Sequence, residues 1–206
     1  MYQLYSIPGS CSTGIHVLLQ KLKIPVEIRL RDEVQNYKDL VATNQVPALQ
    51  TDDKLLTEGA AIALHLLKKY GNSDLANDTD FIQWLMFNYA TLHPAYSKLF
   101  AVNQTMEDGP EKALLLQTLA NRLSEYWSIV DGHLESHEYM HNDQASIVDY
   151  LIAIYVQWGN FFPKTTISIG QNVLNLVNRV TDLPEFKAAI QKENIDYQIP
   201  KNAIAA

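Results

Sequence analysis

The residue best suited to nucleophilic chemistry is Cys11, the only cysteine in the chain. It lies in the run Pro8-Gly9-Ser10-Cys11-Ser12, between a predicted strand and a predicted helix. Free N–H groups and the positive dipole end of a helix start favour a thiolate, so Cys11 would either react itself or stabilise a bound thiolate. A small buried hydrophobe explains a lone cysteine equally well, and N-capping is the simpler interpretation of Ser10 and Ser12.

Two further positions offer polar groups to a ligand. Pro47 lies where a strand should start, and frequency alone favours a trans Val46–Pro47 bond. A cis bond would instead turn the N–H and C=O of Val46 outward, toward an extended peptide. Glu58 and Gly59 open a predicted helix, where a plain capping acid is the simpler interpretation of Glu58. In the alternative, Glu58 receives a ligand ammonium and the Gly59 N–H takes a ligand carboxylate.

Two motifs in the second half concern helix geometry. Pro94 removes the backbone hydrogen bond to Ala90 and predicts a kink, at which His93 is either a packed structural residue or faces a cleft. Ser146 and Asp149 form a capping-box variant before an apolar run. This motif sets where a buried helix begins and says nothing about catalysis.

The elements that carry these residues change character along the chain. Apolar spacing predicts strands over 2–6, 26–30, 46–50 and 54–56, and helices over 15–22, 37–42 and 60–67. This β-α-β unit followed by a hairpin and a helix is the order of a thioredoxin-like domain. After a polar linker over 74–80, helical spacing continues over 81–103, 116–134, 151–158, 173–180 and 184–192. We therefore predict an α/β thioredoxin-like domain over 1–73 and an all-α domain over 81–206.

Composition excludes several classes of function. The 206 residues include 16 basic and 23 acidic side chains, a formal net charge of −7, which argues against a nucleic-acid partner. One cysteine cannot form an intramolecular disulfide or a cysteine-based zinc cluster, and we expect no metal. The sequence has no export signal and no apolar stretch of transmembrane length, which predicts a soluble cytoplasmic protein with no membrane partner.

Five motifs in order resemble those of the cytosolic glutathione S-transferases, most closely the bacterial beta class. They are Leu4-Tyr5-Ser6-Ile7-Pro8-Gly9-Ser10-Cys11-Ser12, Gln45-Val46-Pro47-Ala48-Leu49, Leu56-Thr57-Glu58-Gly59, His93-x-x-Tyr96-Ser97-x-Leu99-Phe100 and Ser146-Ile147-Val148-Asp149. The resemblance implies a glutathione-binding thioredoxin-like domain, a helical acceptor-substrate domain, a homodimer and a role in detoxification.

The resemblance also implies roles for single residues. The glutathione-binding set would be Gln45, Val46 before a cis Pro47, Glu58 and Gly59. The catalytic set near the glutathione sulfur would be Cys11, Ser10, Ser12 and His93. Trp158 and Tyr96 would line the acceptor pocket, with core packing as the alternative for Trp158. Ser6 stands where the family has its catalytic-type tyrosine, and Tyr5 cannot replace it because neighbouring strand side chains face opposite ways. Lys38 is the candidate for the lysine of the family's second-helix region.

The expected reaction is attack of the glutathione thiolate on the electrophilic carbon of a small, largely hydrophobic compound, with glutathione as co-substrate. Two alternatives keep glutathione as the ligand. In one, Cys11 is the redox centre of a thiol-disulfide or peroxide enzyme. In the other, the chain is a glutathione-binding module with little catalysis, because Ser6 replaces the tyrosine.

Overall fold

The computed structural model describes residues 2–201 and divides into two compact units, each described here by itself. The first unit runs to Leu85 and also takes in Thr181–Asp196, and the second comprises Met86–Val180 and the chain from Tyr197. The sequence pattern assigned residues 181–196 to the helical domain, whereas their contacts group them with the sheet. The last residues of the predicted helical domain, 202–206, lie outside the described part.

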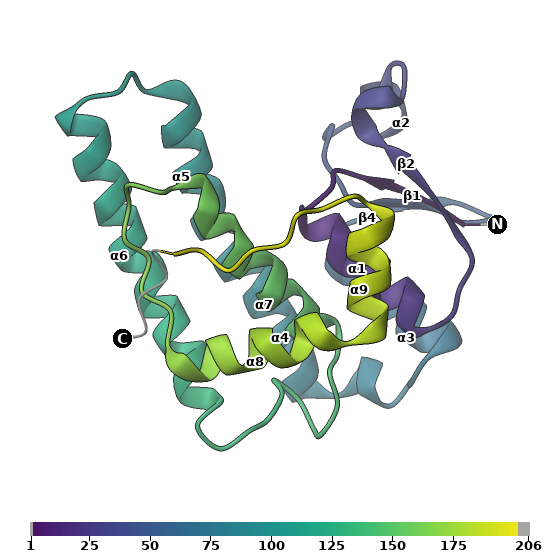
Figure 1. Ribbon diagram of the computed structural model, residues 1–206. Helices are drawn as coiled ribbons and strands as arrows, with labels where there is room; N and C mark the ends of the chain where they lie inside the picture. The colour runs from purple at the N-terminus through teal and green to yellow at the C-terminus, as the bar shows by residue number, and fades with distance from the viewer. Residues whose placement is uncertain (1, 202–206) are drawn as a thin grey trace. The chain divides into compact units, whose positions relative to one another are not determined.

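The first unit is built on a four-stranded sheet in the order β2-β1-β3-β4 (Figure 1). Its strands are β1 Tyr2–Ser6, β2 Val26–Leu30, β3 Ala48–Gln50 and β4 Leu55–Thr57. β1 and β2 are parallel and β3 is antiparallel to both β1 and β4. A parallel pair needs a crossover, which the helix α1 (Cys11–Lys21) provides. The predicted strand and helix order is confirmed.

Helices and two short 3₁₀ turns complete this unit. They are α2 Tyr37–Leu40, α3 Gly59–Tyr70 and α9 Pro184–Lys192, with 3₁₀ turns η1 Arg31–Glu33 and η2 Leu75–Asn77. Most positions of the predicted apolar stripes of α1 and α3 are buried. They are Ile15, Leu18 and Leu19 in α1, and Ala60, Ala63 and Leu67 in α3. α9 lies alongside α1 (Figure 1), a neighbour far away in sequence that no local pattern indicates.

The second unit is helical. Its elements are the π-helical turn η3 Asn88–Leu92, α5 His93–Thr105, α6 Pro110–His133, α7 Ile147–Gln157 and the 3₁₀ turn η4 Trp158–Phe161. Two more helices, α4 Thr79–Phe87 and α8 Gln171–Asp182, each have residues in both units. The stretch 81–103, predicted as one helix with a kink, is thus interrupted by a π turn. Pro94 has no N–H to donate to the Ala90 carbonyl. One residue earlier, the His93 N–H donates to the Asn88 carbonyl, five residues back, as in a π-helix.

The predicted capping box at the start of α7 is confirmed. The Ser146 hydroxyl accepts from the Val148 N–H, and Asp149 Oδ2 accepts from the Ser146 N–H at 2.8 Å. Asp149 Oδ1 accepts a further bond from the Met140 N–H at 2.8 Å. Burial of this carboxyl raises its pKa above the usual range. Within residues 2–201, no helix combines the length and apolar character needed to cross a membrane.

Candidate active site

Cys11 is the first residue of α1, and its thiol is buried. Its side chain is 4% exposed, and Sγ–H donates to the carbonyl of Val46 at 3.6 Å. Burial raises the pKa of Cys11 to about 12, although the backbone N–H groups of Cys11 and Ser12 act in the opposite direction. The helix start therefore favours the thiolate as expected, but loss of water outweighs it, and the thiol is neutral at pH 7.

The serine hydroxyls around Cys11 bond mainly to one another. Ser10 caps α1 by accepting from the Ser12 N–H at 3.2 Å. The Ser12 hydroxyl is buried and lies 2.7 Å from both the Ser10 and the Ser6 hydroxyls. Sequence reasoning missed this use of Ser6, which is fully buried and anchors Ser12. Tyr5 packs on the opposite face against Tyr37, as the alternation of a strand requires.

The Val46–Pro47 bond is cis, so the trans expectation from frequency is wrong and the cis form implied by the family resemblance is present. The Tyr37 hydroxyl donates to the carbonyl of exposed Gln45 at 2.9 Å and holds the loop before the proline. Across the described residues, the Val46 N–H makes no hydrogen bond. An unused backbone donor thus lies one residue before Pro47, beside a carbonyl that faces Cys11.

Glu58 immediately precedes α3 and has a left-handed backbone, with φ of 65°. Its side chain is exposed and makes no capping hydrogen bond to α3, so the plain capping interpretation does not describe it. The first N–H groups of α3, beginning at Gly59, lack intrahelical acceptors. The Glu58 charge also raises the pKa of Cys11, as a smaller cause than burial. A positive φ at a non-glycine residue costs roughly 1–3 kcal/mol and is typical of functional positions.

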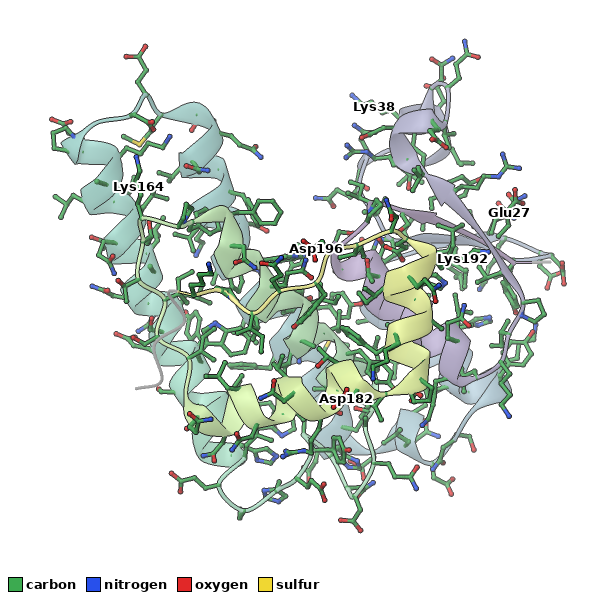
Figure 2. All side chains as sticks on the ribbon, viewed as in Figure 1. Glu27, Lys38, Lys164, Asp182, Lys192 and Asp196 are labelled. Carbon is green, nitrogen blue, oxygen red and sulfur yellow. The ribbon has the colours of Figure 1, made fainter. Side chains whose placement is uncertain are left out.

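The first unit thus brings together Cys11, the Val46 backbone and the Glu58–Gly59 helix start. Lys38, by contrast, lies exposed on α2, with its side chain extending from the surface (Figure 2). Together, Cys11, Val46, Glu58 and Gly59 offer a thiol, an unpaired backbone N–H, an open helix start and a carboxylate. Such a set suits a peptide-like ligand that carries both an ammonium and a carboxylate.

The second unit gathers the other predicted residues into an aromatic cluster. The Trp158 ring lies 5.3 Å from the His93 ring, 5.5 Å from the Tyr96 ring and 5.8 Å from the Phe100 ring. Burial lowers the pKa of His93, which favours the neutral imidazole. Tyr96 is fully buried, and its hydroxyl accepts from the Trp127 indole N–H at 3.3 Å. Its ring therefore belongs to the core that supports Trp158 and His93.

Comparison with known proteins agrees with the resemblance found in the sequence. Residues 4–74 match the model of the glutathione S-transferase N-terminal domain. This segment of the chain is similar to that domain. The predicted resemblance to glutathione S-transferases is thereby confirmed. The matched segment includes Cys11, Val46, Pro47, Glu58 and Gly59.

Matches beyond this glutathione S-transferase domain cover most of the chain. A relative from Xanthomonas campestris pv. campestris, glutathione S-transferase GST-4.5, is 23% identical, over 94% of this chain and 100% of its own length. The structure of a glutathione S-transferase from Xylella fastidiosa matches with a TM-score of 0.83 and 22% identity, covering 95% of this chain and 100% of that one.

A third match comes from a solved complex. It is a glutathione transferase from Pseudomonas putida with one glutathione disulfide bound per subunit, at a TM-score of 0.75 and 20% identity, covering 92% of this chain and 90% of that one. These structural matches confirm the predicted glutathione S-transferase fold, and the named relatives support a glutathione transferase enzyme.

Proposed function

We propose that this chain is a glutathione transferase that joins the thiol of glutathione to small, largely hydrophobic electrophiles. Glutathione would bind to the first unit, held by Gln45, Val46, Pro47, Glu58 and Gly59. The observation that carries the proposal is the unpaired Val46 N–H beside Cys11 and the open, uncapped start of α3. On the family resemblance, we also propose a cytoplasmic homodimer that acts in detoxification.

The polar groups of the first unit fit the γ-glutamyl end and the cysteinyl backbone of glutathione. The γ-glutamyl end carries an ammonium and a carboxylate on one carbon. Exposed Glu58 supplies a negative charge for the ammonium, and the open N–H groups at Gly59 supply donors for the carboxylate. The Val46 N–H and C=O would pair with the cysteinyl backbone as an added strand does. This pairing would bring the glutathione sulfur beside Cys11.

The protonation state of Cys11 favours conjugation over thiol exchange. A neutral thiol can donate a hydrogen bond to the glutathione thiolate and so lower the free energy of that anion. The pKa of about 12 keeps Cys11 protonated for this role. A redox enzyme would instead need Cys11 as a thiolate, which burial opposes. Ser10, next to Cys11 and only partly buried, would be a second donor. The Ser12 hydroxyl is fully buried and lies 2.7 Å from both Ser6 and Ser10, which makes it the less accessible of the two.

The acceptor electrophile would meet the aromatic cluster of the second unit. Trp158 would line the acceptor pocket, and fully buried Tyr96 would support Trp158 from the core. Apolar and aromatic walls suit hydrophobic electrophiles. His93, neutral through burial, belongs to the same cluster.

Two measurements test the proposal. The first is calorimetric titration with glutathione, and the second is the reaction rate with a chloronitrobenzene, an epoxide and an enal. We expect saturable binding and turnover of at least one electrophile. Binding without any turnover would support the binding module, and a disulfide adduct of one glutathione on Cys11 with disulfide-reductase activity would support the redox enzyme. Absence of binding would refute all three functions.

A further inference from the structure

A chain of hydrogen bonds links α9 to the loop that carries Cys11. The Thr13 hydroxyl donates to Glu193 Oε2 at 2.7 Å. The same hydroxyl oxygen accepts from the Gly9 N–H at 3.0 Å. Glu193 directly follows α9, whose last residue, Lys192, is marked in Figure 2. A side chain at position 193 thus reaches the backbone at position 9 through a single intermediary.

The chemistry of these groups fixes the direction of the chain. A carboxylate oxygen only accepts hydrogen bonds, and a threonine hydroxyl has a single hydrogen. Glu193 therefore takes the Thr13 hydrogen, which leaves the hydroxyl lone pairs facing the Gly9 N–H. Thr13 and the Glu193 side chain are buried, so water does not compete for these bonds.

The second oxygen of Glu193 is held just as firmly. His16 Nδ1 lies 2.8 Å from Glu193 Oε1, and both side chains are completely buried. Gln20 Nε2 lies 3.1 Å from His16 Nε2 and fixes the other side of the imidazole. These contacts leave the carboxylate one orientation, with Oε2 aimed at Thr13.

Gly9 is the turning point of the loop before Cys11. Its φ of 75° lies in the left-handed region, and the Ser10 N–H closes the turn on Ile7 O at 3.0 Å. Ser10 then caps α1, and Cys11 follows as its first residue. Movement of the Gly9 amide would therefore shift the cap and the position of the Cys11 thiol.

We infer that Glu193 and Thr13 are positioning residues that hold the Cys11 loop in place from α9. The proposed glutathione transferase function is needed only for the catalytic consequence of this role. The effect on the Cys11 thiol itself is independent of that function, so the two can fail separately.

The alkylation rate of Cys11 measures the position of this loop directly, because the chain contains no other cysteine. Thr13→Val removes the hydroxyl with little change in side-chain shape, whereas Thr13→Ser keeps the hydroxyl. Glu193→Gln replaces an obligate acceptor with a group that also donates. Lys21→Met is the matched control, since it removes the other α1–α9 ion pair, Lys21 to Glu185, at the far end of α1.

We expect iodoacetamide to alkylate Cys11 at least fivefold faster in folded Thr13→Val and Glu193→Gln than in the wild type, because the released loop exposes the thiol. Gly9 amide hydrogen exchange should accelerate in the same variants. Thr13→Ser should stay within twofold of the wild type, and so should Lys21→Met, whatever its thermal stability. An unchanged rate in folded Thr13→Val, or equal acceleration by Lys21→Met, would overturn the inference.

The final readout separates this inference from the proposed function. With glutathione and an electrophile, Thr13→Val should lower kcat more than it raises KM for glutathione. If the wild type binds no glutathione while the alkylation pattern holds, the transferase proposal fails and the positioning role stands. If glutathione binds and turns over but alkylation does not respond to Thr13→Val, the positioning role fails alone.

Discussion

Two helix starts of this chain satisfy their backbone in opposite ways. At α7, Ser146 and Asp149 bond to the backbone N–H groups of the cap, and Asp149 also binds the Met140 N–H. At α3, the residue in the cap position, Glu58, makes no capping bond and has a left-handed backbone. One helix start is closed by its own side chains, and the other leaves its donors open.

The difference separates a helix start satisfied by its own side chains from one whose donors are open. At α7, Ser146 and Asp149 occupy the cap N–H groups, and these residues contribute to stability. An open start with an exposed carboxylate beside it can receive an anion and a cation together. The start of α1 is intermediate between the closed start of α7 and the open start of α3. Its cap hydrogen bond is made by Ser10, but its first residue, Cys11, carries a thiol that could contact a ligand.

The largest effect that we expect is the pH dependence of Cys11 alkylation at the start of α1. The rate constant for alkylation of wild-type Cys11 should rise about tenfold per pH unit from pH 7 to 10, roughly 1000-fold in all, because only the thiolate reacts. The pKa of about 12 lies above this whole range. Iodoacetamide kinetics followed by mass spectrometry check it. A plateau below pH 9 would show that the α1 start activates the thiol after all.

At the closed start, Asp149→Ala should lower the free energy of unfolding by about 3 kcal/mol, since the buried Met140 N–H and the half-buried Ser146 N–H lose their acceptor. Urea denaturation measures this loss. The exposed Asp143→Ala variant serves as the control and should change stability by less than about 0.5 kcal/mol. Glutathione affinity of the folded Asp149→Ala protein should be unchanged, and a large loss of affinity would contradict a purely structural role.

At the open start, binding and stability should separate. Glu58→Gly and Glu58→Ala should each weaken glutathione binding about 10- to 100-fold, because the ammonium loses a charged partner. Glycine adopts the φ of 65° without strain, so Glu58→Gly should unfold at the same temperature as the wild type or above it. Titration calorimetry and thermal unfolding measure the two properties. Wild-type affinity in Glu58→Gly would remove Glu58 from the site.

The smallest effect is expected from the cap hydroxyl of α7. Ser146→Ala should cost about 1 kcal/mol of unfolding free energy, and Ser146→Thr should recover most of it, since threonine also caps. Chemical denaturation of the two variants and the wild type measures the free energies of unfolding to be compared. Equal losses in both would mean that packing around residue 146, and not the hydrogen bond, sets the stability of this end.

Local pattern alone predicted a large part of this molecule. The strand and helix order of the first unit follows from apolar spacing, and the capping box of α7 from two residues three positions apart. Such features depend on neighbours within a few residues, which the sequence displays directly. The motifs around Cys11, Pro47 and Glu58 likewise predict the similarity to the glutathione S-transferase N-terminal domain.

Tertiary structure decided what these residues do to one another. The high pKa of Cys11 arises from burial, and the Val46–Pro47 bond is cis although frequency alone favours trans. The contact of Thr13 with Glu193 joins residues 180 positions apart. The sequence determined which groups are available and where each helix starts, because those are local properties. Burial and long-range hydrogen bonds depend on how the chain packs, so only the folded molecule could show that α9 helps to hold the Cys11 loop.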